Sequence, residues 1–262
     1  MTVRRLPFLI PDLDALGLPV QLKQFVEQRS KGLILITGST GSGKTTTQAA
    51  MLEYVNVRRA VHIITIEQPI EYVISAKRAI VTQRDVPTNV PNFAASLEAA
   101  KRQRPDIIMI GESRDRDTVD TMLNAADSGH LVIGTMHSKS AEETINTLLA
   151  FYTGDEIAHK RNLIASVLIC IDSQVLIPSR DGRKLVLGYE LLVNNAAVSQ
   201  VIRQGKFSQI ENTITTSGAK DGSILLNEVL ADKVRRREIR PEDALRESYK
   251  PDELQRQVAA YA

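Results

Sequence analysis

The sequence of 262 residues predicts an α/β fold with a mostly parallel β-sheet covered by helices on both faces. Two observations lead to this prediction. Short, wholly apolar segments alternate with amphipathic segments of helical period along residues 31–155. A glycine-rich stretch follows the first apolar segment and precedes the first long helical one, where a phosphate-binding loop connects a strand to a helix. The length suits one large domain with a small extension.

The elements follow in order along the chain. Residues 1–30 form a lead-in whose spaced leucines predict a partly buried turn and a helix. The strands that we expect next are 32–37, 62–66, 79–82, 107–110 and 131–135. The helices that we expect between and after them are 46–56, 92–103, 117–127 and 140–151. Apolar strands that alternate with helices favour parallel strands, because each crossover helix returns the chain to the same edge of the sheet.

The pattern changes after about residue 155. A helix is predicted over 157–170, followed by strands at 175–178 and 184–191 that flank a turn containing Asp181-Gly182. From Ala196 the chain is helical and charged, with a break at 221–222 and a last helix that begins at Pro241. We therefore expect a lead-in at 1–30, a main domain with a small β-hairpin at 31–195, and a C-terminal helical subdomain at 196–262.

The glycine-rich stretch matches the phosphate-loop pattern G-x-x-x-x-G-K-[ST] at every fixed position. Its residues, with the first helical residue, are Gly38, Ser39, Thr40, Gly41, Ser42, Gly43, Lys44, Thr45 and Thr46, and we expect this set to bind nucleotide. The glycines let backbone N–H groups point at phosphate oxygens. Lys44 reaches the terminal phosphates, and the Thr45 hydroxyl is placed to ligate Mg²⁺. The alternative, a glycine- and serine-rich surface turn, does not explain the strand and helix on either side.

Three reactive side chains follow three predicted strands. Glu67, Glu112 and His137 come just after the strands at 62–66, 107–110 and 131–135. Ligands of open parallel sheets bind at the carboxyl ends of the strands, where the phosphate loop also lies. We expect Glu112 to orient or deprotonate an attacking water, with Glu67 as second candidate, and His137 to contact the γ-phosphate. Solvated strand-end side chains are the alternative interpretation.

The neighbouring positions limit where a metal could bind. His130 and His137 stand at opposite ends of one strand, roughly 20 Å apart at about 3.3 Å per residue, so they cannot share a metal and we assign His130 a structural role. Phosphate-loop enzymes usually have an Asp where this chain has Gly111. We expect Mg²⁺ to depend on Thr45, the phosphates, water, and either Glu67 or Glu112.

Composition argues against several classes of protein. The net charge of +2 and the aromatic content of 4% give no sign of a nucleic-acid-binding surface. The densest basic cluster, Arg235 to Arg237 with Arg240, is expected to be a solvated helix face, with a membrane or partner contact as the alternative. A single cysteine, Cys170, excludes a disulfide framework and a C-x-x-C zinc site. With no long apolar run, we expect a cytoplasmic protein.

Four motifs together resemble the secretion-ATPase superfamily of type IV pili and type II–IV secretion, closest to its pilus-retraction (PilT/PilU-like) branch. They are the phosphate loop, an Asp-box-like segment at 65–72, an atypical second nucleotide motif at 105–115, and a His-box-like segment at 128–137. A partial match to the retraction signature follows at 197–206. The assembly branch usually adds a four-cysteine zinc module, which one cysteine cannot form.

The resemblance implies a RecA-like, Mg²⁺-dependent ATPase that works as a ring, usually a hexamer. It implies Glu112 as general base, Glu67 as a carboxylate that positions water or metal, and His137 near the γ-phosphate. It also implies twitching motility through pilus retraction, a location peripheral to the inner membrane, and a membrane platform protein as partner.

The sequence differs from the family pattern at three places. Gln68 replaces the usual Asp of the Asp box, Arg104 stands where an Asp precedes the Pro-Asp pair, and the family's N-terminal PAS-like domain is missing. Arg4 and Arg5 precede the matching region, and no role is assigned to them. The alternatives are an ATP-binding accessory subunit that docks on an active ring of a paralogue, a motor that takes its N-terminal domain from another chain, or a type IV secretion or conjugation motor.

Overall fold

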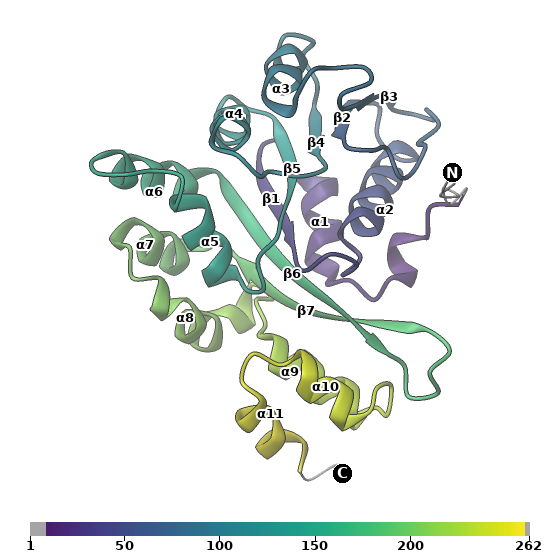
Figure 1. The fold of residues 1–262 in the computed structure, drawn as a ribbon, viewed down its shortest axis with the longest axis vertical. Helices are drawn as coiled ribbons and strands as arrows, with labels where there is room; N and C mark the ends of the chain where they lie inside the picture. Colours follow the sequence, from purple (N-terminus) through teal and green to yellow (C-terminus); the bar gives the residue numbers. More distant parts are fainter. Residues whose placement is uncertain (1–8, 260–262) are drawn as a thin grey trace.

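The computed structural model describes residues 9–259, except for the side chains of residues 217 and 219. Arg4 and Arg5 lie outside the described residues. A seven-stranded sheet with the order β3-β2-β4-β5-β1-β6-β7 forms the centre of the molecule (Figure 1). Its strands are β1 (Gly32–Thr37), β2 (His62–Glu67), β3 (Ile80–Asp85), β4 (Ile107–Ile110), β5 (Leu131–Met136), β6 (Leu168–Pro178) and β7 (Leu185–Val193). The first six strands are parallel, and only β7 runs antiparallel to its neighbour. This confirms the predicted α/β fold.

Helices connect the strands and cover the sheet. They are α1 (Val20–Gln28), α2 (Lys44–Asn56), α3 (Phe93–Lys101), α4 (Arg116–Asp127), α5 (Ala141–Leu149), α6 (Glu156–Val167), α7 (Ala196–Gln204), α8 (Ile210–Ser217), α9 (Leu226–Arg235), α10 (Pro241–Glu247) and α11 (Pro251–Val258). Short 3₁₀ turns lie at Leu13–Ala15, Phe207–Gln209 and Gly218–Lys220. Side-chain N-caps begin four helices: Asn92, Asp115, Ser140 and Asn195 each accept a hydrogen bond from the first turn. In the part of the chain that is described, no helix is long and apolar enough to cross a membrane.

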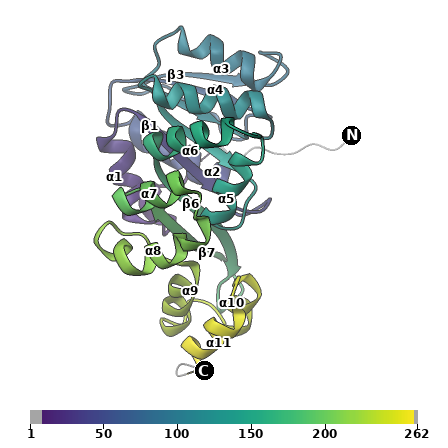
Figure 2. The same cartoon turned by 90° about the vertical axis from the view of Figure 1, so that its left-hand side faces the viewer.

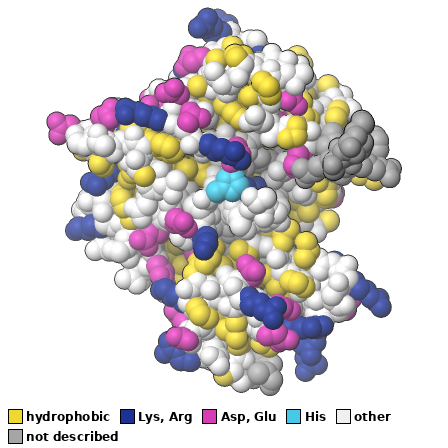
Figure 3. Space-filling model, in the orientation of Figure 1, with side chains coloured by type: hydrophobic (Ala, Val, Ile, Leu, Met, Phe, Trp, Pro, Cys, Tyr) yellow, Lys and Arg dark blue, Asp and Glu magenta, His cyan; other side chains and the backbone are white. Residues whose placement is uncertain are grey.

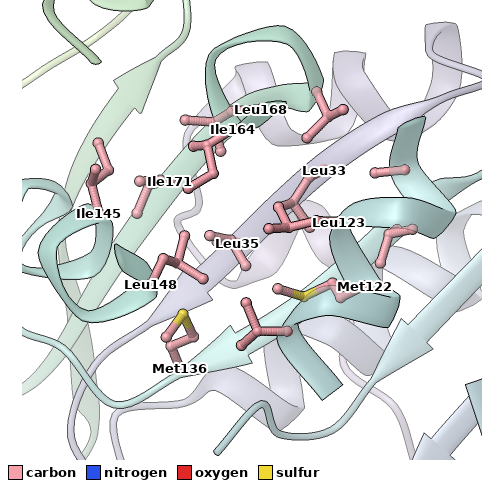
Figure 4. Packing of buried hydrophobic residues seen from close by; sticks show 14 of the residues in the cluster. Leu33, Leu35, Met122, Leu123, Met136, Ile145, Leu148, Ile164, Leu168 and Ile171 are labelled. Carbon is pink, nitrogen blue, oxygen red and sulfur yellow. The ribbon is translucent and has the colours of Figure 1, made fainter. Parts of the chain in front are cut away.

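The two faces of the sheet bury separate apolar cores. Alternate residues of β1 point to opposite faces, so Leu33 and Leu35 pack with α3 to α8, whereas Ile34 and Ile36 pack with α1 and α2. Figure 4 shows the first core, where side chains of α4, α5 and α6 meet β1, β5 and β6. Both cores hold β1 rigidly, and β1 leads directly into the phosphate loop.

The boundary between α6 and β6 differs from the prediction. A helix was expected over 157–170, but the helix ends at Val167 and Leu168 begins a strand of 11 residues. Residues 168–171 are apolar and pair with β1 on one side, while 170–178 pair with β7 on the other. Apolar residues that are buried on both faces of a strand have no alternation, so they resemble a continued helix. The hairpin is therefore longer than expected and belongs to the main sheet.

The C-terminal helices divide between two apolar cores. Helices α7 and α8 add Val198, Ile202 and Ile214 to the core under α4 to α6. Helices α9 to α11 instead pack around the distal half of the β6–β7 hairpin, and we call this unit the C-terminal lobe. Figures 1 and 2 show it below the main body. The prediction that the last helix begins at Pro241 was wrong, because Pro251 begins a further helix.

A cavity of about 590 Å³ lies between the C-terminal lobe and the main body. Its lining includes the start of the phosphate loop, the first turn of α5, and the segment between α10 and α11. Acidic and basic side chains both occur where the large upper body meets the smaller lower lobe (Figure 3). The cavity therefore brings charged residues of the lobe close to the phosphate loop.

Candidate active site

The phosphate loop joins the end of β1 to the start of α2. Gly38, Gly41 and Gly43 have φ values of 140°, 83° and 97°, in the left-handed region that residues with a Cβ avoid. Gly43 is the N-cap of α2, so the loop passes straight into the helix. The backbone N–H groups at this helix N-terminus have no intrahelical partner and favour an anion.

The side chain of Lys44, the first residue of α2, reaches back into the loop. Its Nζ donates to the carbonyl oxygens of Gly38 at 2.8 Å and Ser39 at 2.9 Å. Burial lowers the pKa of Lys44, and the Glu112 carboxylate acts in the opposite direction. The ammonium is thus close to the positions where backbone N–H groups would meet phosphate oxygens.

The remaining predicted loop residues occupy distinct places. The Ser42 hydroxyl is buried without a hydrogen-bond partner among the described residues. Thr45 is half-buried in the first turn of α2. The Thr46 hydroxyl lies 3.1 Å from the Tyr72 hydroxyl, which anchors the first turn of α2 to the segment after β2. The Ser39 and Thr40 side chains are exposed at the loop tip.

The loop glycines offer a direct test by substitution. A Cβ on Gly38 would lie 2.4 Å from the Gln174 carbonyl oxygen, whereas a Cβ on Gly41 would meet nothing within 4 Å. The φ value alone costs about 1–3 kcal/mol in either variant. We expect Gly38→Ala to lose ADP binding in calorimetric titrations and Gly41→Ala to retain most of it. Equal losses in both variants would contradict the close approach of Gln174 and of the Ser42 hydroxyl, which also lies 2.4 Å from that Cβ position.

Glu112 and His137 are in contact. His137 Nε2 lies 2.6 Å from Glu112 Oε1, and Arg114 pairs with the same carboxylate. Glu112 follows β4 and His137 follows β5, so the contact joins two adjacent strand ends. The Glu112 side chain is 19% exposed and that of His137 is 42% exposed, so both remain accessible from solvent.

Glu67 occupies a separate, more enclosed place. It ends β2 and is 4% exposed. Its Oε1 accepts hydrogen bonds from Thr65 Oγ1 at 2.6 Å and Gln83 Nε2 at 3.1 Å. Burial raises the pKa of Glu67, and these two donors partly lower it. Glu67 therefore lies at the same edge of the sheet as Glu112 and His137, but its hydrogen-bond partners belong to β2 and β3.

Gly111 explains how β2 and β4 approach each other here. Its N–H donates to the Ile66 carbonyl at 2.8 Å, and a Cβ at this position would lie 3.3 Å from Glu67 Cα. An Asp at position 111 would press on the backbone that carries Glu67. The geometry thus supplies a physical reason for the absence of the usual Asp.

The other residues singled out by sequence lie away from this pair. His130 precedes β5, and its Nδ1 lies 3.0 Å from the Ala125 carbonyl, at the end of β5 opposite to His137. Gln68 is exposed in the turn after β2. Arg104 is exposed with φ of 51° before β4. Among the described residues, no group of three or more His, Cys, Asp or Glu could hold a metal ion.

Three buried polar residues beside the loop were not predicted from the sequence. Asp172 and Gln174 on β6 are wholly buried, and Glu190 on β7 is 7% exposed. Burial raises the pKa of Asp172 and of Glu190 to about 7 in each case. The sequence could have revealed such a residue only as an isolated acidic residue within an apolar segment, as in Ile171-Asp172-Ser173.

Comparisons with known proteins identify the family of the chain. The family described as "Type II/IV secretion system protein" matches residues 3–258. The chain is 36% identical over 251 residues to a "Twitching motility protein" of Neisseria gonorrhoeae, covering 96% of this chain and 67% of that one. It is 39% identical over 216 residues to the "Type IV pilus retractation ATPase PilT" of Pseudomonas aeruginosa, covering 82% and 62% of the two chains.

Solved structures show the same fold. The pilus retraction motor PilT with bound ADP superposes with a TM-score of 0.90 at 41% identity, over 97% of this chain and 71% of that one. The ATPase DotB of Legionella pneumophila gives 0.83 at 29% identity, over 92% and 66%. The chain spans between 62% and 71% of the length of four curated relatives. With the family match across nearly all of its length, the chain belongs to the type II/IV secretion ATPase family and is an ATPase.

Proposed function

We propose that this protein hydrolyses ATP to power a type IV pilus machine, in the direction of pilus retraction and twitching motility. The observation that carries the proposal is the Glu112–His137 pair at 2.6 Å, on the sheet edge that also bears the phosphate loop. The names of its relatives, a twitching motility protein and a pilus retraction ATPase, support the biological setting.

Each residue of the site has a role in this proposal. The loop N–H groups and Lys44 bind the β- and γ-phosphates of ATP. Glu112 accepts a proton from the attacking water, and Arg114 pairs with its carboxylate. His137 stabilises the charge that develops on the γ-phosphate. Glu67 orders water at the same edge.

Mg²⁺ fits the donor set of the loop. The half-buried Thr45 follows Lys44 in the first turn of α2, and the carboxylates of Glu67 and Glu112 belong to the ends of the neighbouring strands β2 and β4. Thr45 would hold the ion together with phosphate oxygens. Bound there, Mg²⁺ supplies positive charge that neutralises the phosphates.

A ring gives this chemistry a mechanical output. We propose a homo-oligomer, a hexamer as in the resemblance, on the cytoplasmic side of the inner membrane. A platform protein in that membrane is its proposed partner, and a paralogous ATPase or a separate N-terminal domain is a further one. Nucleic acid is not among the proposed partners.

Two alternatives keep some support. Gln68, which is exposed where the family has an Asp, favours an ATP-binding accessory subunit docked on an active ring. The family match, which is described for type II/IV secretion, favours a related type IV secretion or conjugation motor. Both would use the same phosphate loop.

Steady-state phosphate release from ATP with Mg²⁺, measured across protein concentrations, tests the proposal. We expect a specific activity that rises steeply with concentration, because subunits must assemble, and no release from Lys44→Ala. Binding of ATP without turnover at every concentration would instead favour the accessory subunit.

A further inference from the structure

We propose that Gln174 is a positioning residue for the phosphate loop, oriented by the buried carboxyl group of Asp172. The inference deepens the proposed ATPase site and rests on it. Gln174 touches both ends of the loop without belonging to it, and Asp172 determines which way its amide points.

The backbone of Gln174 lies against the start of the loop. Strand β6 pairs with β1 through Ile36 with Asp172 and Thr37 with Ser173. Gln174 therefore lies beside Gly38, where the chain leaves β1. Its carbonyl oxygen lies 2.4 Å from the position that a Cβ on Gly38 would take. The loop can leave the strand at this point only because nothing larger than a hydrogen separates the two backbones.

The side chain of Gln174 reaches the end of the loop. Thr47 Oγ1 lies 3.2 Å from Gln174 Oε1 and 3.0 Å from Nε2. Thr47 belongs to the first turn of α2, and its N–H donates to the Gly43 carbonyl at 2.9 Å. Gln174 thus connects the first turn of α2 to the strand beside β1, and it fixes the distance between the two ends of the loop.

Asp172 holds the Gln174 amide from the other side. Its Oδ2 accepts a hydrogen bond from Gln174 Nε2 at 2.7 Å. Asp172 Oδ1 is buried with no hydrogen-bond partner among the described residues. A buried, half-satisfied carboxyl group destabilises the fold. A role in orienting Gln174 would explain why a carboxyl group stands here despite its destabilising effect on the fold.

Nucleotide affinity should depend on this arrangement because the loop binds phosphate through several N–H groups at once. If the ends of the loop move apart, those groups no longer converge on the same oxygens, and affinity falls without the loss of any direct ligand. Gln174 itself donates nothing to the nucleotide.

Titration of a fluorescent ADP analogue with Mg²⁺ into the full chain tests the inference. We expect Gln174→Met, which keeps the length but loses the amide, to weaken binding about tenfold, the effect of one or two buried hydrogen bonds. Asp172→Ala should weaken binding to a similar extent, and Asp172→Asn, which keeps an acceptor oxygen, should restore it. The Asp172→Ala/Gln174→Met double variant should bind no more weakly than Gln174→Met alone.

Cys170→Ala is the matched control. Cys170 lies on the same face of β6, two residues before Asp172, and is wholly buried with no bond to the loop. The substitution removes buried volume from the same strand and should leave the affinity for ADP unchanged.

Equal affinities for Gln174→Met and the wild-type chain would overturn the inference, as would additive losses in the double variant. ADP binding requires no hydrolysis. A wild-type chain that binds ADP but releases no phosphate would therefore contradict the proposed motor and leave this inference standing. A wild-type chain that fails to bind ADP would overturn both.

Discussion

Glu112→Gln is expected to lower kcat for ATP hydrolysis by about 10²–10⁴-fold, the usual contribution of a general base. The amide keeps the shape of the side chain and can still contact His137 and Arg114, which now meet the carboxylate. It cannot take a proton from water. Affinity for ATP should change little or increase, because a negative charge near the phosphates is removed. The loss therefore belongs in kcat and not in KM.

Single-turnover phosphate release together with nucleotide titration checks this prediction. Arg114→Ala is the control on the same carboxylate: its side chain is 73% exposed, and surface ion pairs contribute about 0–1 kcal/mol. We expect that variant to keep most of its activity. Turnover by Glu112→Gln at the wild-type rate would contradict the assignment of Glu112 as the general base and leave Glu67 as the candidate.

The Glu112–His137 contact was predictable because parallel strands bring distant residues to one edge. Twenty-five positions separate the two residues, yet β4 and β5 are neighbours in register, Ile110 with Gly134. A short apolar run followed by a reactive side chain was a sufficient signal. The pattern could not predict that Glu67 is bonded to Gln83 and not to the Glu112–His137 pair. Gln83 comes from β3, an edge strand with only one buried residue, which gives a weak sequence signal.

The residues beneath the loop were harder to predict for a physical reason. Asp172 and Gln174 belong to a strand that is covered on both sides, so the alternation that reveals half-buried strands is absent. Their partner, Thr47, lies 127 positions away from Gln174 and carries no local sign of the contact. Glu190 is likewise a lone acidic residue in β7, and only the packing of α5 against it shows that it is buried.

Glu190→Gln is expected to stabilise the fold at alkaline pH and to change little at acid pH. Glu190 Oε1 accepts a hydrogen bond from the Ala141 N–H at 2.8 Å, at the start of α5. Burial raises the pKa of Glu190 from an ordinary 4.5 to about 7; the Ala141 N–H and Lys250 lower it in part, whereas Glu211 and Glu142 raise it further. The Tyr249 hydroxyl group is a further titratable neighbour in the cavity.

The direction of this pH dependence follows from the number of protons that the folded and unfolded states bind. Between about pH 4.5 and 7 the folded state keeps a proton on Glu190 that the unfolded state has released, so stability falls as pH rises through this window. Above it the cost is constant, about 3 kcal/mol for a shift of this size. A Gln at this position accepts the Ala141 hydrogen bond and never ionises. The stabilisation by Glu190→Gln should thus be near zero at pH 5 and close to its full value at pH 8.

Urea unfolding of both chains from pH 5 to pH 8 measures this difference directly. Asp172, whose pKa burial also raises to about 7, contributes equally to both chains and cancels in the comparison. Glu228→Gln, an exposed carboxylate in the first turn of α9, should follow the wild-type profile throughout. A constant difference between Glu190→Gln and wild type across the pH range would mean that Glu190 ionises normally. In that case water from the cavity beside the phosphate loop would have to reach the Glu190 carboxyl group.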